Sequence, residues 1–258
     1  MNVVPPPPHP ELDPRALTAR FAALAPARGF RLEPFGEIAG CPLLALTRRT
    51  PGPRPRLYLS AGMHGDEPAP PQALYHLLER GVFDERADWF LCPLLNPAGF
   101  LRGTRENEAG VDLNRDYRHF RSGEIRAHAA WLRRQPNFDL TICLHEDWEA
   151  TGFYLYELNP AQRPTLAEAI IAAVGRIFPI DPSPQIDGRP ARGGILRPAI
   201  DPALRESWPE SLYLQAHHAT LGYTIETPSS FPLPRRIEAL AAATTTAIAG
   251  LDRIAAPG

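Results

Sequence analysis

The sequence predicts an α/β protein with a single domain, built on a mixed, largely parallel twisted sheet with helices on both faces. Apolar runs of strand length alternate with segments whose apolar residues recur at helical spacing, an order typical of a sheet covered by helices. The 258 residues suit one large domain, and a hydrophobic content of 44% can supply a substantial core. No internal repeat or change of composition marks a boundary between domains.

The helices are predicted from apolar spacing together with their start and stop signals. Residues 15–25 carry Leu17, Phe21 and Leu24 at helical spacing, and Pro26 follows directly. The other predicted helices have similar signals, including prolines in a first turn and a serine or a glycine at an end. They span residues 68–81, 122–132, 166–177, 212–221 and 234–254.

The strands are predicted from short apolar runs bounded by turn residues. They span residues 30–38, 42–48, 56–61, 89–95, 138–144, 152–158 and 223–225. The first two are joined through Ala39 and Gly40, which predicts a hairpin at the edge of the sheet. Asn96 to Gly99 is predicted to be a turn.

Three segments lack clear periodicity. Residues 1–14 are rich in proline and are expected to form an extended arm, so the folded domain is predicted to cover residues 15–258. Residues 100–117 form a polar stretch with several arginines and asparagines, and a loop of this length in a compact domain is commonly functional. Residues 181–209 are rich in proline, glycine and arginine and are expected to be irregular.

The composition disfavours several classes of function. The net charge is −2, so the chain has no basic field that would hold nucleic acid. Its start lacks the features of a signal peptide and no apolar run is long enough to span a bilayer, so we expect a cytoplasmic protein without a membrane partner. Cys41, Cys92 and Cys143 have no paired metal-ligand spacing and are expected to be reduced core residues.

Candidate metal ligands follow two of the predicted strands. His64 and Glu67 lie in a glycine-flanked turn after residues 56–61, and His145 follows residues 138–144. Open α/β sheets build their sites where strands end, and catalytic zinc typically takes three protein ligands from histidine and carboxylate side chains. Taken alone, each residue also fits a surface turn or a strand end bonded to backbone. Together they predict a zinc site.

Six short motifs between residues 57 and 228 resemble those of the zinc carboxypeptidase family. The family includes metallocarboxypeptidases and murein-peptide amidases and, more distantly, deacylases of the aspartoacylase and succinylglutamate desuccinylase type. The most specific motif is Gly110-Val111-Asp112-Leu113-Asn114-Arg115, because it falls between the two ligand motifs. The other motifs are His64-Gly65-Asp66-Glu67, Asn96-Pro97-Ala98-Gly99-Phe100, Gly103-Thr104-Arg105-Glu106-Asn107, His145 and Thr224-Ile225-Glu226.

The resemblance implies a role for each site residue. His64, Glu67 and His145 would hold one zinc ion per chain. Glu226 would be the general base, and Arg105 would polarise the scissile carbonyl, with Arg102 as its rival. Asn114 and Arg115 would bind the carboxylate of the substrate. General chemistry also favours these residue types, because zinc activates water, a carboxylate can carry its proton, and arginine binds carboxylates through two parallel hydrogen bonds.

Two features leave alternatives open. The family carries a tyrosine about twenty residues before the base, whereas Tyr213 and Tyr223 lie at other spacings, so the tyrosine's role is unassigned. The acidic run Glu146-Asp147-Trp148-Glu149 either orients the ligands and stays solvated or forms a negative subsite for an amine-bearing substrate.

The predicted activity is that of a zinc metallopeptidase, a hydrolase that cleaves an amide bond next to a free carboxylate. Carboxypeptidase or peptide amidase action on small peptides is the leading hypothesis, and an N-acyl-amino-acid deacylase of the aspartoacylase type is the alternative. A non-catalytic binding module on the same scaffold is the alternative from another class. The expected partner is a small peptide or acyl-amino-acid substrate, and the sequence does not predict the oligomeric state.

Overall fold

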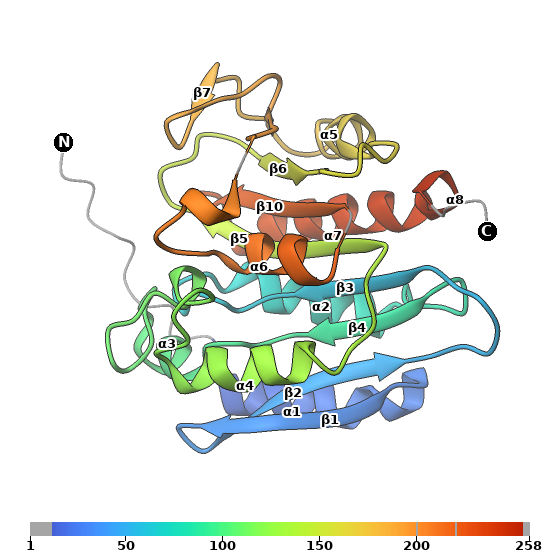
Figure 1. Cartoon of the computed structure of the whole chain (residues 1–258), viewed down its shortest axis with the longest axis vertical. Coiled ribbons are helices and arrows are strands. Elements are labelled where there is room, and N and C mark those ends of the chain that lie inside the picture. Colours follow the sequence, from blue (N-terminus) through green and yellow to red (C-terminus); the bar gives the residue numbers. More distant parts are fainter. Residues whose placement is uncertain (1–11, 200, 220, 255–258) are drawn as a thin grey trace.

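The sheet lies at the centre of the molecule and has eight strands in the order β1-β2-β4-β3-β5-β10-β6-β9 (Figure 1). The computed structural model describes residues 12–199, 201–219 and 221–254, so residues 1–11 of the expected arm lie outside the described residues. The strands are β1 Arg31–Ile38, β2 Cys41–Arg48, β3 Arg56–Ser60, β4 Asp88–Cys92, β5 Leu140–Asp147, β6 Tyr154–Leu158, β9 Ile195–Leu196 and β10 Gly222–Pro228. A separate pair is formed by β7 Gln185–Ile186 and β8 Arg189–Pro190.

The centre of the sheet is parallel and its flanks are mixed. Strands β4, β3, β5 and β10 pair in parallel, and β1 with β2 forms the predicted antiparallel hairpin at one edge. At the other side β6 is antiparallel to β10 and parallel to β9. The parallel strands place their carboxyl ends at one edge of the sheet, which is where open α/β sheets carry their sites.

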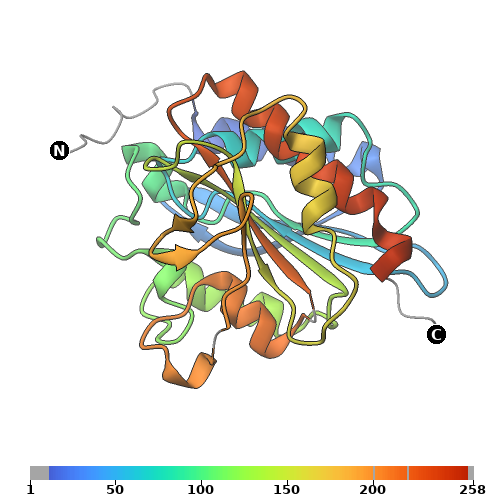
Figure 2. The same cartoon turned by 90° about the horizontal axis from the view of Figure 1, so that it is seen from above.

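Helices cover both faces of the sheet, as the sequence predicts (Figure 2). One face carries α1, α2, α5 and α7, whose apolar side chains share one core cluster, and the other carries α4 and α6. In β3, Leu57 and Leu59 face the first cluster while Tyr58 faces the second, the alternation expected of a strand buried on both sides. The helices are α1 Pro14–Leu24, α2 Ala69–Glu79, α3 Pro97–Arg102, α4 Gly123–Leu132, α5 Ala167–Val174, α6 Glu210–His217, α7 Leu233–Ala249 and α8 Leu251–Ile254, with 3₁₀ turns η1 Pro26–Arg28, η2 Leu113–Arg115 and η3 Pro202–Leu204.

Several expected segments differ from the structure for local reasons. The predicted turn at Asn96 is the start of α3, because the Asn96 side chain accepts a hydrogen bond from Gly99 N at 2.9 Å and Pro97 suits a first turn. Residues 181–209 contain the short strands β7, β8 and β9 as well as irregular backbone. The helix expected over residues 212–221 ends at His217, because Gly222 already pairs in β10 with strands on both sides.

The three cysteines are free and buried, as expected of core residues. Within the described ranges, none of the helices has the length and apolar character needed to cross a membrane.

Candidate active site

The turn after β3 holds two of the predicted ligands, and its glycines explain its shape. Gly62 adopts a φ of 67°, a conformation that glycine adopts without strain. Gly65 packs against α3 so closely that an added Cβ would lie 1.9 Å from the carbonyl carbon of Gly99. Gly65 N also donates to Thr104 O at 2.9 Å. Glycine is therefore required between His64 and Glu67, and α3 fixes the turn.

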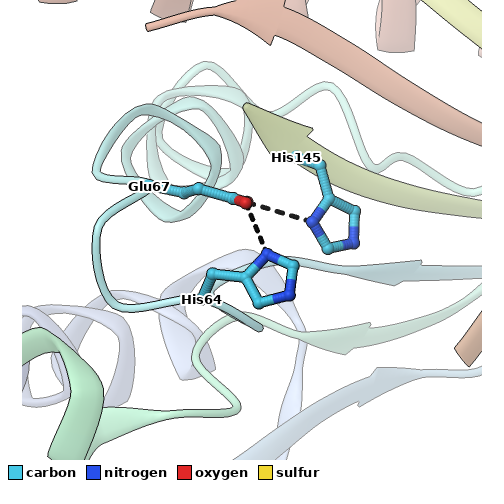
Figure 3. Close-up of side chains that lie close together, drawn as sticks. All are labelled: His64, Glu67 and His145. Carbon is cyan, nitrogen blue, oxygen red and sulfur yellow. Dashed lines mark hydrogen bonds and ion pairs between the residues drawn. The ribbon is translucent and has the colours of Figure 1, made fainter. Parts of the chain in front are cut away.

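His145 joins this pair from β5, so that three buried side chains converge (Figure 3). His64, Glu67 and His145 are only 2%, 3% and 2% exposed, and their ligand atoms all lie within 4.8 Å of one another. Nδ1 of His145 lies 3.0 Å from Glu67 Oε2, and Nδ1 of His64 contacts Glu67 Oε1. Two imidazole nitrogens and a carboxylate oxygen form a donor set that fits a metal ion with one position left open.

The charges of the group also fit a metal site. Burial opposes ionisation of Glu67, but the adjacent His64 and His145 outweigh it and lower the pKa of Glu67. Burial lowers the pKa of His64, but the charge of Glu67 and the hydrogen bond that His64 donates to Asp112 raise it, and the net effect is a raised pKa. Glu67 is therefore ionised at neutral pH, which is the state that binds a cation.

Asp112 orients one ligand and one arginine. Its Oδ1 lies 3.3 Å from His64 Nε2 and accepts from Asn114 N at 2.8 Å, while its Oδ2 accepts from Arg105 Nε at 3.0 Å. Carboxylates commonly fix the tautomer and ring orientation of a metal-binding histidine in this way. Arg105 Nη1 then lies 3.3 Å from His64 Nδ1. The rival Arg102 is exposed and donates to Glu108 O at 3.0 Å, so the geometry favours Arg105.

Glu226 lies on β10 directly beside His145 of β5 in the parallel register. The two side chains line the same cleft. Burial is the largest cause that raises the pKa of Glu226, and the charges of Glu67 and Asp147 add to it, while His145 opposes. A carboxyl whose pKa is raised in this way exchanges its proton closer to neutral pH than an exposed one.

Asn114 and Arg115 reach the cleft from η2. The Asn114 side-chain oxygen accepts from Glu210 N at 2.9 Å, at the start of α6. Arg115 is exposed, and its Nη1 donates to Asn114 O at 2.9 Å. All seven predicted site residues thus line one cleft of about 770 Å³: His64, Glu67, Arg105, Asn114, Arg115, His145 and Glu226.

A tyrosine that sequence reasoning missed also lines this cleft. Tyr154 of β6 is the antiparallel partner of Glu226, and its hydroxyl donates to Asp147 Oδ2 at 2.8 Å. Burial raises the pKa of Tyr154, so the phenol is neutral and acts as a donor. The pattern Tyr154-Leu155-Tyr156 gave a usable signal, because alternate residues of a strand share one face. Neither Tyr213 nor Tyr223 is a lining residue of the cleft.

The acidic run after His145 has structural partners in its first half. Glu146 is buried, forms an ion pair with Arg236 of α7 and accepts from Ala69 N at the start of α2 at 2.9 Å. Asp147 is held by Tyr154, while Trp148 and Glu149 are exposed at the cleft. Glu146 therefore joins β5 to two helices, and both of its carboxylate oxygens have protein partners.

A buried polar chain lies behind the cleft. Both oxygens of Glu210 accept hydrogen bonds, from Tyr58 OH at 2.6 Å and from Ser60 Oγ at 2.7 Å. Tyr58 OH also lies 2.9 Å from Nε2 of His128, whose Nδ1 lies 2.6 Å from Tyr117 OH. This chain anchors the first residue of α6, the residue that holds Asn114, to β3.

The fold and the buried His-Glu-His group together define a hydrolase of the metallocarboxypeptidase superfamily. Comparison with known proteins gives the particular branch. The chain belongs to the succinylglutamate desuccinylase/aspartoacylase catalytic domain family, whose model matches residues 53–188. The resemblance to zinc carboxypeptidases is thus confirmed. The family that matches is the deacylase branch, which the sequence analysis named as the more distant part of that family.

Three relatives extend this result. The solved structure of a proposed metallopeptidase from Shewanella amazonensis SB2B is 30% identical, with a TM-score of 0.78 over 89% of this chain and 90% of that one. A metallo-carboxypeptidase from Pseudomonas aeruginosa, in complex with (2-guanidinoethylmercapto)succinic acid, shares the fold at 21% identity, with a TM-score of 0.66 over 92% and 69%. Carboxypeptidase D of Anas platyrhynchos is 35% identical over a region that covers 43% of this chain and 11% of that protein, so the chain spans about a tenth of its length.

Proposed function

We propose that the protein is a zinc-dependent hydrolase that cleaves an amide bond next to a free carboxylate in a small peptide. The observation that carries the proposal is the buried group of His64, Glu67 and His145, whose ligand atoms lie within 4.8 Å of one another in the cleft that Glu226 also lines. Zinc suits this donor set, and when bound it supplies a Lewis acid that activates water and polarises a carbonyl.

The chain's own side chains divide the remaining work. Glu226 takes up the proton of the attacking water and passes it to the leaving amine, a role that its position in the cleft beside His145 supports. Arg105, held by Asp112 at 3.0 Å, keeps a fixed positive charge where the oxyanion develops. Tyr154 presents a neutral hydroxyl beside Glu226, and its single hydrogen goes to Asp147, so it holds that carboxylate in place in the cleft.

Asn114 and Arg115 are the proposed clamp for the substrate carboxylate. Arg115 has a planar donor fork that matches a carboxylate, and its exposed position at the cleft leaves the fork accessible. The Pseudomonas carboxypeptidase, which has the same fold, binds a succinic acid derivative, and this supports a carboxylate-bearing ligand here.

The second candidate is an N-acyl-amino-acid deacylase, which the family match favours. Both activities need a metal, a base, a polarising arginine and a carboxylate clamp. They differ in the acyl side of the substrate, so a panel of dipeptides, γ-glutamyl peptides and N-acyl amino acids separates them.

The proposal is tested first by metal analysis of the purified protein. We expect about one zinc per chain, and chelation should abolish hydrolysis and lower the melting temperature. His145→Ala should lose the metal, whereas Glu226→Gln should keep it and lose turnover. Protein without stoichiometric metal that gains no thermal stability from added zinc would overturn the metal assignment, and near-normal turnover in Glu226→Gln would overturn the base.

A further inference from the structure

The residue after His145 carries a buried carboxylate that has no part in the proposed reaction. Successive side chains of a strand point to opposite faces of a sheet, so Glu146 points away from His145 and meets α2 and α7. Its ion pair with Arg236 of α7 joins two side chains that are 0% and 3% exposed. Outside the His-Glu-His group, the described residues contain no other ion pair in which both side chains are buried this deeply.

The second oxygen of Glu146 caps the start of α2. Its Oε2 accepts from Ala69 N at 2.9 Å. Pro68 precedes the helix without a side-chain cap, and Pro70 and Pro71 have no amide hydrogen. Ala69 is therefore the only one of the first three residues of α2 with an N–H to satisfy, and its partner lies 77 positions further along the chain.

This hydrogen bond joins the two segments that carry the metal ligands. Ala69 lies two residues after Glu67, and Glu146 lies directly after His145. Arg236 holds the other oxygen of the same carboxylate, so the orientation of that carboxylate is fixed. The start of α2 and the end of β5 are thus held together by a contact that does not involve the ligands themselves.

Stability alone does not account for this ion pair. Taking two charges out of water costs free energy that their attraction only partly recovers, and apolar side chains of similar volume often stabilise a protein as well or better. The pair is also incompletely satisfied, because Nε of Arg236 is buried without a hydrogen-bond partner among the described residues. What the pair does provide is a fixed geometry between β5, α2 and α7.

We infer that Glu146 is a positioning residue for the metal site. The hydrogen bond that it accepts from Ala69 N sets the separation of Glu67 from His145 before a metal binds, and Arg236 acts through Glu146 by fixing its carboxylate. Ligands that are already held at the right distance lose little freedom on binding, so the affinity for zinc is higher. The inference rests on the proposed function, because it requires a metal at the His-Glu-His group.

Two double variants isolate the hydrogen bond in a background without the buried charges. Glu146→Gln/Arg236→Met keeps an oxygen that can accept from Ala69 N, and Glu146→Leu/Arg236→Met does not. As a matched control, Glu157→Leu/Arg197→Met removes another pair with a buried carboxylate, whose hydrogen bonds reach neither ligand segment. The dissociation constant for zinc is measured by competition with a chromophoric chelator, at a temperature where circular dichroism shows every variant to be folded.

We expect the leucine variant at position 146 to bind zinc about 10- to 100-fold more weakly than the wild type, the range for lost partners that orient metal ligands. The glutamine variant should regain most of this affinity, and the control should keep all of it. A loss of stability alone cannot produce this pattern, because it changes the apparent dissociation constant only through the fraction of folded protein. Equal zinc affinities in the glutamine and leucine variants, or an equal loss in the control, overturn the inference.

Hydrogen exchange in the wild type tests the same contact without any substitution, so it also serves if the leucine variant does not fold. In chelator-treated protein, the amide hydrogen of Ala69 should exchange far more slowly than that of an unstructured chain, because Glu146 accepts it without a metal. NMR measures this rate. Exchange as fast as in an unstructured chain overturns the inference.

These outcomes keep the positioning role apart from the proposed reaction. If zinc affinity follows the hydrogen bond from Ala69 but the protein hydrolyses no member of the substrate panel, the positioning role stands and the proposed reaction fails. If the protein binds zinc and hydrolyses the panel but the glutamine and leucine variants bind zinc equally, the reaction stands and the positioning role fails.

Discussion

Replacing His128 tests the buried polar chain behind the cleft through the pH dependence of stability. A neutral imidazole with its hydrogen on Nε2 satisfies both contacts of His128, since Nδ1 then accepts from Tyr117 OH at 2.6 Å and Nε2 donates to Tyr58 OH at 2.9 Å. A charged imidazolium could not accept from Tyr117. Burial, with a smaller effect of His218, lowers the pKa of His128 from 6.5 to about 3.

The direction of the effect follows from proton binding in the two states. The unfolded chain binds a proton at His128 near its ordinary pKa, whereas the folded protein does so only near pH 3, so acid favours the unfolded state. The contribution of His128 to the free energy of unfolding is fully present above pH 6.5 and is lost as the pH falls towards 3. Over the whole window it amounts to about 5 kcal/mol, and between neutral pH and pH 4.5 to roughly 3 kcal/mol.

His128→Gln keeps one acceptor and one donor but removes the titration. The variant should be less stable than the wild type at pH 7.5, by on the order of 1 to 2 kcal/mol for an altered buried hydrogen-bond network. The difference should then shrink or reverse by pH 4.5, because only the wild type loses the contribution of His128. Urea unfolding of chelator-treated protein at pH 7.5, 6.0 and 4.5 measures this. Parallel pH curves for the two proteins would refute the reasoning.

The remaining predictions concern the site. Gly65→Ala should lower both zinc content and melting temperature, because its Cβ would collide with the backbone of α3, and unchanged metal binding would contradict that packing. Arg115→Ala should lower kcat/KM on free-acid substrates by roughly 10-fold or more with little effect on C-terminally amidated ones, and Arg115→Lys should restore only part of the loss. Equal wild-type rates on free-acid and amidated substrates would remove the clamp. Glu210→Gln should raise KM more than it lowers kcat while zinc content stays constant, because Glu210 positions Asn114; a loss confined to kcat would contradict this.

The sequence carried enough information to predict the architecture and the central group because both depend on local signals. The strand before His64 and the helix after Glu67 are marked by an apolar run, glycines and prolines, and the run before His145 marks β5. The end of β5 was less predictable. Pairing with β10 continues the strand to Asp147, so His145 lies inside it, and such pairing is a long-range effect.

Other parts of the site depend on contacts between segments distant in the sequence. Tyr154 reaches the cleft because β6 pairs with β10. The number of residues between Tyr154 and Glu226 along the chain does not reveal this pairing. The connection over residues 181–209 contains strands of only two residues, which are too short to produce a periodic pattern. The helix α3 was hidden because the residues that cap it also favour turns.

The pairing of β5 with β10 fixes two residues of the site, whereas the connection over residues 181–209 is less constrained. His145 and Glu226 are neighbours on paired central strands, where adjacent chains lie about 4.8 Å apart, so neither can move without disrupting the sheet. Residues 181–209 instead form most of the connection between α5 and α6, and insertions and substitutions are better tolerated in such connections. Exchanging residues 181–209 for the corresponding connection of a relative should therefore transfer substrate preference while leaving the reaction itself intact.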